Sequence, residues 1–462
     1  MNDGRLDPVT LSVLASALAG IAEEMGAVLI RGAYSSNIKE RRDCSTALFD
    51  ERGRMVAQAE HIPIHLGAMP EAVAAVMSRD PEPGDVFAIN DPYSGGTHLP
   101  DITLVSTVAP GEDGEIVGYA VTRAHHSDVG GMRPGSMPSD SREIYQEGII
   151  IPPVRLVHGG EYVQDVLDLL LANVRTPDLR RGDLRAQIAA NNIAEERIRE
   201  LMERRGKDTV LAAFDEVISY TEKRTREAIR ELPDGEYTAE DFLEGDGTTD
   251  EDIRIKATVT IEDDSMTIDF TGTADAVEGN VNCPLPVTRS ACYFALRVLL
   301  PKGIPANAGT YAPLEIKAPE GSLVNAKSPS AVVAGNVETS NRIADAVLAA
   351  FSSFASDMLP AQGQGTMNNT IIGGPGWTYY ETIGGGQGAS ARGPGASGVH
   401  VGMSNTLNTP TEAFEIEYPM RVERYELIYD SGGAGKNRGG DGIVRSVRVL
   451  EPASLSLLTD RR

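Results

Sequence analysis

The stretch D-I-T-L-V-S-T-V-A-P-G-E-D-G-E-I-V-G-Y-A-V-T-R-A-H (101–125) decides the fold around it. Residues 102–108 alternate apolar and polar side chains, residues 116–124 are rich in Val, Tyr and Thr, and a Pro/Gly/Asp turn separates them. This pattern predicts a β-hairpin. With the turn centred near Glu112, we expect Arg123 opposite Asp101. His125 then lies on the same face as Asp101, whereas a register shifted by one residue would place His126 there.

Histidines gather around this hairpin. Six of the seven lie between positions 61 and 158, and His98 precedes Asp101 by three residues, with Pro100 between them. That proline keeps the pair out of a helix interior, so we expect the chain to bend round the start of the strand. His98, Asp101 and His125 would then face one point, and such donors suit Zn, Mn or Fe. The alternative is a histidine-rich loop that only hydrogen-bonds to backbone.

Length and charge limit the classes of protein. A chain of 462 residues is long enough for two or three domains. Its 67 acidic and 42 basic residues give a net charge of −25, which argues against nucleic acid or an anionic membrane as a partner. The most apolar long stretch, 11–30, contains Glu23 and Glu24, so we expect no signal peptide or membrane span.

The cysteines indicate the compartment. The chain has three, Cys44, Cys283 and Cys292, with no CxxC pair among them. An odd number without a pairing motif favours a reducing compartment, so a cytoplasmic location is expected. We expect all three to be small buried side chains.

The remaining pattern predicts an α+β protein with several domains, mixed or antiparallel sheets, long helices and Gly-rich loops. Helices are expected over 8–32 with Asp7 as N-cap, over 183–232 with a break at Gly206, and over 287–299 and 337–358. Strands are expected over 45–58 as a hairpin, 85–90, 254–261 and 265–270. The expected parts are an N-terminal α+β domain with the metal site (1–180), a helical region (181–235) and a C-terminal α+β domain with a Gly-rich tract (236–462).

Three segments allow more than one interpretation. The charged run K-E-R-R-D (39–43) is either a solvated face or a site for a substrate anion or an interface. The Gly-rich tract 362–402 is expected to form tight turns between short strands, the alternative being backbone amides close to a ligand. The segment 430–442 contains Gly435-Lys436, but Asp430 and Asn437 replace the Gly and the Ser/Thr of a phosphate loop, so it predicts no nucleotide site.

Nine segments, in order and spread over nearly the whole chain, together resemble the hydantoinase B/oxoprolinase family. They are D-P-V-T (7–10), N-I-K-E-R-R-D (37–43), A-E-H-I-P-I-H-L-G (59–67), N-D-P-Y-S-G-G-T-H-L-P-D (90–101), A-H-H-S-D-V-G-G (124–131), G-D-L-R-A-Q (182–187), G-N-V-E-T-S (335–340), S-N-T-L-N-T-P (404–410) and S-G-G-A-G-K-N-R-G-G-D-G (431–442). The chain stops at L-L-T-D-R-R (457–462), where the family usually continues further.

The resemblance implies the smaller partner of a two-subunit, ATP-dependent enzyme that hydrolyses cyclic amides such as hydantoins or 5-oxoproline. It implies a divalent metal on His98, Asp101 and His125, and ATP on an A-like partner rather than on this chain. The expected assembly is a hetero-oligomer with two copies of each subunit. Similar B-like subunits occur in acetone and acetophenone carboxylases, so a ketone carboxylase is the alternative, and a non-catalytic scaffold subunit is the third possibility.

In the hydrolase interpretation, the partner phosphorylates the amide oxygen and metal-activated water attacks the small-molecule substrate on this subunit. Asp128 is expected to orient a ligating imidazole or to act as a base. His61 and His65 are candidate proton-transfer groups, and a structural role as loop histidines is the alternative.

Overall fold

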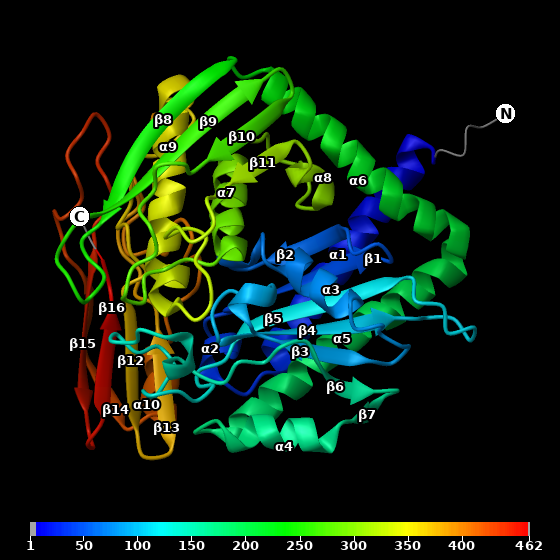
Figure 1. Cartoon of the computed structure of the whole chain (residues 1–462), viewed down its shortest axis with the longest axis horizontal. Coiled ribbons are helices and arrows are strands. Elements are labelled where there is room, and N and C mark those ends of the chain that lie inside the picture. The colour runs from blue at the N-terminus through cyan, green and yellow to red at the C-terminus, as the bar shows by residue number, and fades with distance from the viewer. Residues whose placement is uncertain (1–5, 461–462) are drawn as a thin grey trace.

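The computed structural model describes residues 6–460, and its centre is an antiparallel sheet that contains the predicted hairpin (Figure 1). The strand order is β2-β1-β5-β4-β3-β6-β7, and every neighbouring pair is antiparallel. The strands are β1 (Cys44–Asp50), β2 (Met55–Glu60), β3 (Val86–Ile89), β4 (Asp101–Val108), β5 (Gly118–His125), β6 (Val154–His158) and β7 (Glu161–Tyr162). The hairpins β1–β2 and β4–β5 and the strand β3 confirm the predictions for this region.

Three long helices cover one face of this sheet: α1 (Pro8–Gly32), α5 (Pro177–Arg205) and α6 (Lys207–Arg230). Asp7 caps α1 as expected, because its carboxylate accepts from the N–H groups of Val9 and Thr10. Among the described residues, only α1 has the length and apolar composition of a membrane span. Its apolar side chains pack against α5, β1 and β2 in the core.

The opposite face of the sheet packs against α3 (Met69–Met77) and α7 (Leu285–Leu299). Strand alternation explains the division, because Ala47 and Phe49 contact this second core while Leu48 contacts the first. The shorter helices are α2 (Ser36–Lys39), α4 (Gln164–Ala172), α8 (Ala308–Tyr311) and α10 (Thr411–Glu417), with 3-10 turns at Pro63–His65, Pro92–Ser94 and Ile144–Gln146.

A second sheet, of order β11-β10-β9-β8, packs on α7 and α9 (Ser340–Ala355) near the top of Figure 1. Its strands are β8 (Gly235–Leu243), β9 (Ile253–Glu262), β10 (Ser265–Asp269) and β11 (Leu314–Lys317). The β10–β11 pair is parallel, so this sheet is mixed. The helix expected over 337–358 is shorter at its C-terminal end, and its first part is a π-helical turn, Gly335–Thr339.

The C-terminal part forms a three-stranded sheet of order β13-β12-β16 and a separate two-stranded ribbon, β14–β15, on the left of Figure 1. The strands are β12 (Asn369–Gly374), β13 (Trp377–Glu381), β14 (Met420–Leu427), β15 (Ile443–Val449) and β16 (Ser454–Leu458). The observed elements confirm the α+β class with several sheets.

The Gly-rich tract contains the tight β12–β13 turn, as expected, but its later glycines have another role. A Cβ on Gly386 would lie 2.0 Å from the carbonyl oxygen of Gly440, and one on Gly440 would lie 1.8 Å from that of Ala396. These glycines therefore let the tract pack backbone to backbone against the loop 430–442, which joins β14 to β15.

The charged run 39–43 is not a solvated face along its whole length. Lys39 and Arg42 are exposed, but the side chains of Arg41 and Asp43 are buried. Of the two interpretations left open for this run, the solvated face therefore does not hold for these two residues. Arg41 contacts the C-terminal part of the chain instead, as described below.

Candidate metal centre

The β4–β5 register places Asp101 opposite His125 and Thr103 opposite Arg123. The expectation that Arg123 faces Asp101 is wrong, because the turn is centred one residue later than expected and each pairing moves by two residues. A shift of two residues preserves the face of every side chain. His125 therefore lies on the same face as Asp101, and His126 does not share it.

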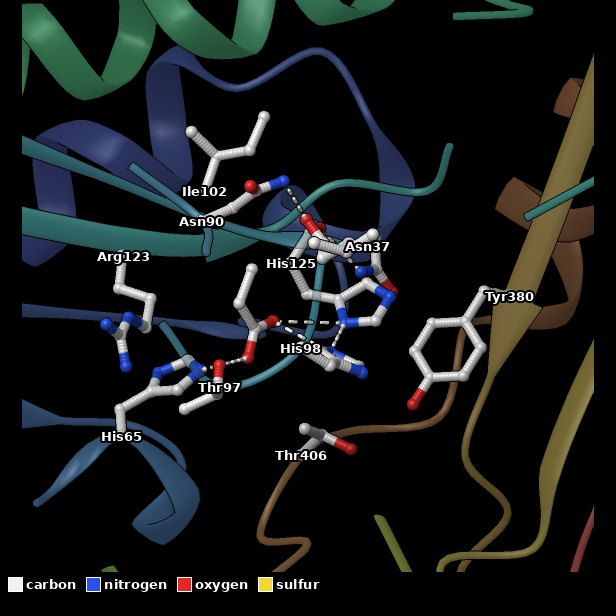
Figure 2. A network of polar contacts seen from close by, with 12 residues as sticks. Asn37, His65, Asn90, Thr97, His98, Ile102, Arg123, His125, Tyr380 and Thr406 are labelled. Atoms are coloured by element: carbon white, nitrogen blue, oxygen red, sulfur yellow. Dashed lines mark hydrogen bonds and ion pairs between the residues drawn. The ribbon is translucent and has the colours of Figure 1, made fainter. Parts of the chain in front are cut away.

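His98, Asp101 and His125, the candidate ligand trio, meet at the open end of this hairpin (Figure 2). Nε2 of His98 lies 3.1 Å from Oδ1 of Asp101, and Nδ1 of His125 lies 3.2 Å from the same oxygen. The two ring nitrogens are 3.1 Å apart. All three side chains are buried.

This geometry fits a divalent cation. Three donor atoms separated by about 3.1 Å can all reach one ion at the usual ligand distance of about 2.1 Å. Two imidazoles and one carboxylate on one side of an ion form a facial set that leaves further positions for water or substrate. These donor types suit Zn, Mn or Fe.

The second carboxylate oxygen of Asp101 has its own partners. Thr97 donates to Oδ2 at 2.5 Å, and Nε2 of His65 lies 3.5 Å from it. The other ring nitrogen of His65 is 3.0 Å from the hydroxyl of Ser45. Of the two histidines considered for proton transfer, the structure therefore brings His65 to the trio.

His61 lies elsewhere, next to α1. A Cβ on Gly26 would lie 2.8 Å from Cε1 of the His61 ring, so the glycine makes room for this side chain. The backbone carbonyl of His61 accepts a hydrogen bond from Asn405. These contacts favour the structural alternative for His61, and its catalytic role stays a prediction.

Burial and neighbouring charge set the ionisation of Asp101 and His125. Burial alone would raise the pKa of Asp101, but the charge of His98 and hydrogen bonds from His125, His65 and His98 outweigh it and hold that pKa well below its usual range. Burial, only partly offset by Asp101, lowers the pKa of His125. At neutral pH, Asp101 is ionised and His125 is neutral, the forms that bind a metal.

His126 belongs to a different contact. Its Nε2 lies 2.9 Å from Oε1 of Gln187 on α5, and the Gln187 amide donates to the carbonyl of Ile102. Burial, and next the charge of Arg180, lowers the pKa of His126 to about 4. Through Gln187, His126 connects α5 with the β4–β5 hairpin and does not contact the trio's carboxylate. Gln187 lies within the motif G-D-L-R-A-Q, but its spacing gave no sign of this contact.

The carboxylate of Asp128 supports the loop after β5. It accepts from the N–H groups of Gly130, Gly135 and Arg175, and the Arg175 guanidinium lies 2.9 Å from Oδ2. These partners favour a structural role over the expected contact with a ligating imidazole. The predicted role as a base remains a prediction.

The C-terminal part of the chain completes the wall of the site. The ring of Tyr380, on β13, stacks on His125 with 4.4 Å between ring centroids and 18° between planes (Figure 2). Its hydroxyl donates to Oδ1 of Asn369 on β12. Tyr380 lies 255 positions from His125, and sequence analysis did not single it out.

The three cysteines are buried and have no disulfide partners. This confirms the expectation that they are small buried side chains. Burial raises the pKa of Cys283 to about 12 and raises that of the other two further.

The sequence profile of the hydantoinase B/oxoprolinase family matches residues 7–462. The uncharacterized protein MJ0963 of Methanocaldococcus jannaschii is 44% identical, and the match covers 99% of this chain and 81% of that protein. 5-oxoprolinase 1 of Arabidopsis thaliana is 40% identical, and the match covers 99% of this chain but only 37% of the plant protein. A Pseudomonas sp. protein named as the B-type component of a D-/L-hydantoinase is 36% identical over 99% of this chain and 80% of its own length.

Two solved structures share the fold. The ATP-dependent caprolactamase from Pseudomonas jessenii is 31% identical with a TM-score of 0.90, covering 97% of this chain and 79% of that one. A nucleotide-free acetone carboxylase is 19% identical with a TM-score of 0.89, covering 98% of this chain and 64% of that one. At this lower identity, the second likeness concerns the fold alone.

Proposed function

The chain belongs to the hydantoinase B/oxoprolinase family, and from this premise we propose that it is the B-like subunit of an ATP-dependent hydrolase that opens a cyclic amide. The observation that carries the proposal is the buried trio of His98, Asp101 and His125, with donor atoms 3.1–3.2 Å apart. The names 5-oxoprolinase, hydantoinase and caprolactamase, borne by relatives, have one bond type in common: an amide within a ring.

The trio would hold one divalent cation, Zn, Mn or Fe, which when bound lowers the pKa of a water molecule and polarises a carbonyl. Thr97 and His65 contact Oδ2 of Asp101, so Oδ1 stays directed at the two imidazoles. We assign proton transfer to His65, because it contacts both Asp101 and the hydroxyl of Ser45. Burial of the trio keeps bulk water away from these groups.

The nucleotide belongs, in this proposal, to an A-like partner. An amide carbonyl is a poor electrophile, so phosphorylation of its oxygen on the partner would precede attack on this subunit. The relative named as a B-type hydantoinase component supports an assembly of different subunits. The segment 430–442 lacks the residues of a phosphate loop and joins two strands here. Two copies of each subunit and a cytoplasmic location are parts of the same proposal.

The test is a product analysis of the chain reconstituted with an A-like subunit. The pair is incubated with ATP and either 5-oxoproline, hydantoin or caprolactam, and the products are identified by mass spectrometry. We expect an ATP-dependent ring-opened acid from one of these, lost in Asp101→Asn. The matched control is Glu161→Gln, an exposed carboxylate on β7, which should keep wild-type turnover.

Other outcomes identify the alternatives. A carboxylated ketone formed from acetone, bicarbonate and ATP would assign the chain to the carboxylases. Normal assembly with the partner, with Asp101→Asn turning over substrate as fast as the wild type, would favour a scaffold subunit.

A further inference from the structure

The motif N-I-K-E-R-R-D (37–43) holds the backbone of His125 from both sides. The N–H of His125 donates to the carbonyl of Asp43 at 3.0 Å, and the side-chain amide of Asn37 donates to the carbonyl of His125 at 2.8 Å. Both ends of the motif therefore contact one candidate ligand. Neither contact is to the imidazole itself.

Arg41 extends this contact to the C-terminal part. One terminal nitrogen donates to Oδ1 of Asn37 and to the carbonyl of Tyr380, and the other donates to the hydroxyl of Thr382. Its Nε donates to the carbonyl of Leu407. These partners are neutral oxygens, and the side chain is fully buried. Removing a guanidinium from water costs free energy, and these hydrogen bonds offset that cost.

The imidazole of His125 lacks the hydrogen bond that usually orients a ligand. Metal-binding histidines commonly donate their second ring N–H to a carboxylate or carbonyl, which fixes the ring. Within the described part of the chain, Nε2 of His125 is buried and has no hydrogen-bond partner. The stacked ring of Tyr380, 4.4 Å away, is the contact that can set the plane of the imidazole.

We propose that Asn37 and Arg41 form a clamp that positions His125 by holding Tyr380 against its ring. Asn37 binds the carbonyl of His125, Arg41 binds both Asn37 and the carbonyl of Tyr380, and so the two stacked residues are fixed relative to each other. The guanidinium carbon also lies 4.8 Å from the centroid of the Tyr380 ring. Tyr380 and Arg41 are positioning residues, and their role rests on the proposed metal site.

The test is a Co²⁺ titration of the full chain, followed by visible absorption. Tyr380→Leu should weaken Co²⁺ binding by about tenfold or more, as loss of an orienting partner does, and change the cobalt spectrum. Tyr380→Phe keeps the ring and should bind within about threefold of the wild type. The matched control is Tyr379→Leu, an equally buried neighbour that contacts Phe414 and Tyr418 on the other face of β13. It should keep the wild-type affinity and spectrum.

Arg41→Lys gives an independent measurement if Tyr380→Leu does not fold. Lysine keeps the charge but cannot make the forked contacts, so we expect Co²⁺ binding to weaken several-fold with the ligands unchanged. A folded Tyr380→Leu or Arg41→Lys with wild-type affinity and spectrum would overturn the clamp, as would an equal loss in Tyr379→Leu. A wild-type chain that binds no Co²⁺ would overturn the metal site itself, and the clamp with it.

Discussion

Asp101 and His125 face each other across the β4–β5 pair, with Oδ1 of the carboxylate 3.2 Å from Nδ1 of the imidazole. The hydrogen-bond ladder between the two strands fixes the backbone positions of such cross-strand partners. The ladder therefore places both side chains on one face of the hairpin, as a shared ion would require.

Removal of a ligand should remove the metal. We expect His98→Ala and Asp101→Ala to lose the bound divalent ion, measured by elemental analysis of dialysed protein. His158→Ala is the control, because this half-exposed histidine contacts Asp85, the residue before β3, and is not one of the three candidate ligands. Full occupancy in both ligand variants would rule out this site.

The same measurement of metal content should distinguish the two adjacent histidines, His125 and His126. His125→Ala should lose the metal, whereas His126→Ala should keep it and lose stability instead. The second variant leaves a cavity and removes the hydrogen-bond partner of Oε1 of Gln187, which together cost about 2–4 kcal/mol. Thermal unfolding measures this loss, and the reverse pattern of metal content would assign the site to His126.

Part of this site could be predicted from local pattern, and part could not. The face of His125 follows from strand alternation, which survives a two-residue error in register. The predicted centre of the turn is wrong by one residue, because residues 110–114 contain two glycines. The sequence alone does not specify the positive φ of 68° that Gly114 adopts. Tyr380 and Gln187 reach the site from distant elements, so no local spacing could connect them with His125 or His126.

The same contrast between local pattern and distant contacts holds for α1 and Arg41. The α1 helix was predicted to its ends, since Asp7 and Pro8 mark its start by local chemistry. By contrast, Arg41 belongs to a charged run that is usually solvated, and only the C-terminal loop 406–407 and the strand β13 explain its burial. The division into parts 1–180, 181–235 and 236–462 stays a prediction.

Stability should fall with rising pH because of Glu147. Burial, the largest cause, outweighs hydrogen bonds from Val333, Ser141 and Val332 and raises its pKa from 4.5 to about 8. The folded protein thus binds a proton that the unfolded chain has released in this range. The stabilisation from the proton on Glu147 is complete below about pH 4.5. It is lost as the pH rises towards 8, at about 1.4 kcal/mol per pH unit.

The substitution Glu147→Gln should flatten this dependence. The amide keeps the shape without a titratable proton, so the melting temperature should decline less between about pH 6 and pH 9 than that of the wild type. Glu161→Gln, at an exposed position on β7, should follow the wild-type curve. Parallel curves for Glu147→Gln and the wild type would show that Glu147 does not titrate there.

Substitution of alanine for two glycines, Gly96 and Gly20, should change the stability in opposite directions. In the loop before His98, a Cβ on Gly96 would lie 2.2 Å from the carbonyl oxygen of Asn90, so Gly96→Ala should cost more than about 2 kcal/mol and reduce metal content. In α1, Gly20 has nothing within 4 Å of a Cβ. Gly20→Ala should therefore stabilise the chain by about 1 kcal/mol. Chemical denaturation measures both, and equal effects would contradict the packing of the loop.

The contacts of Arg41 impose an order on biosynthesis. Its partners Tyr380, Thr382 and Leu407 are made more than 300 residues after it. Until the last of these partners has been made, the guanidinium lacks these hydrogen bonds and the wall beside His125 is incomplete. In the proposed metal site, loading of an ion in the final geometry would therefore have to follow the synthesis of these residues.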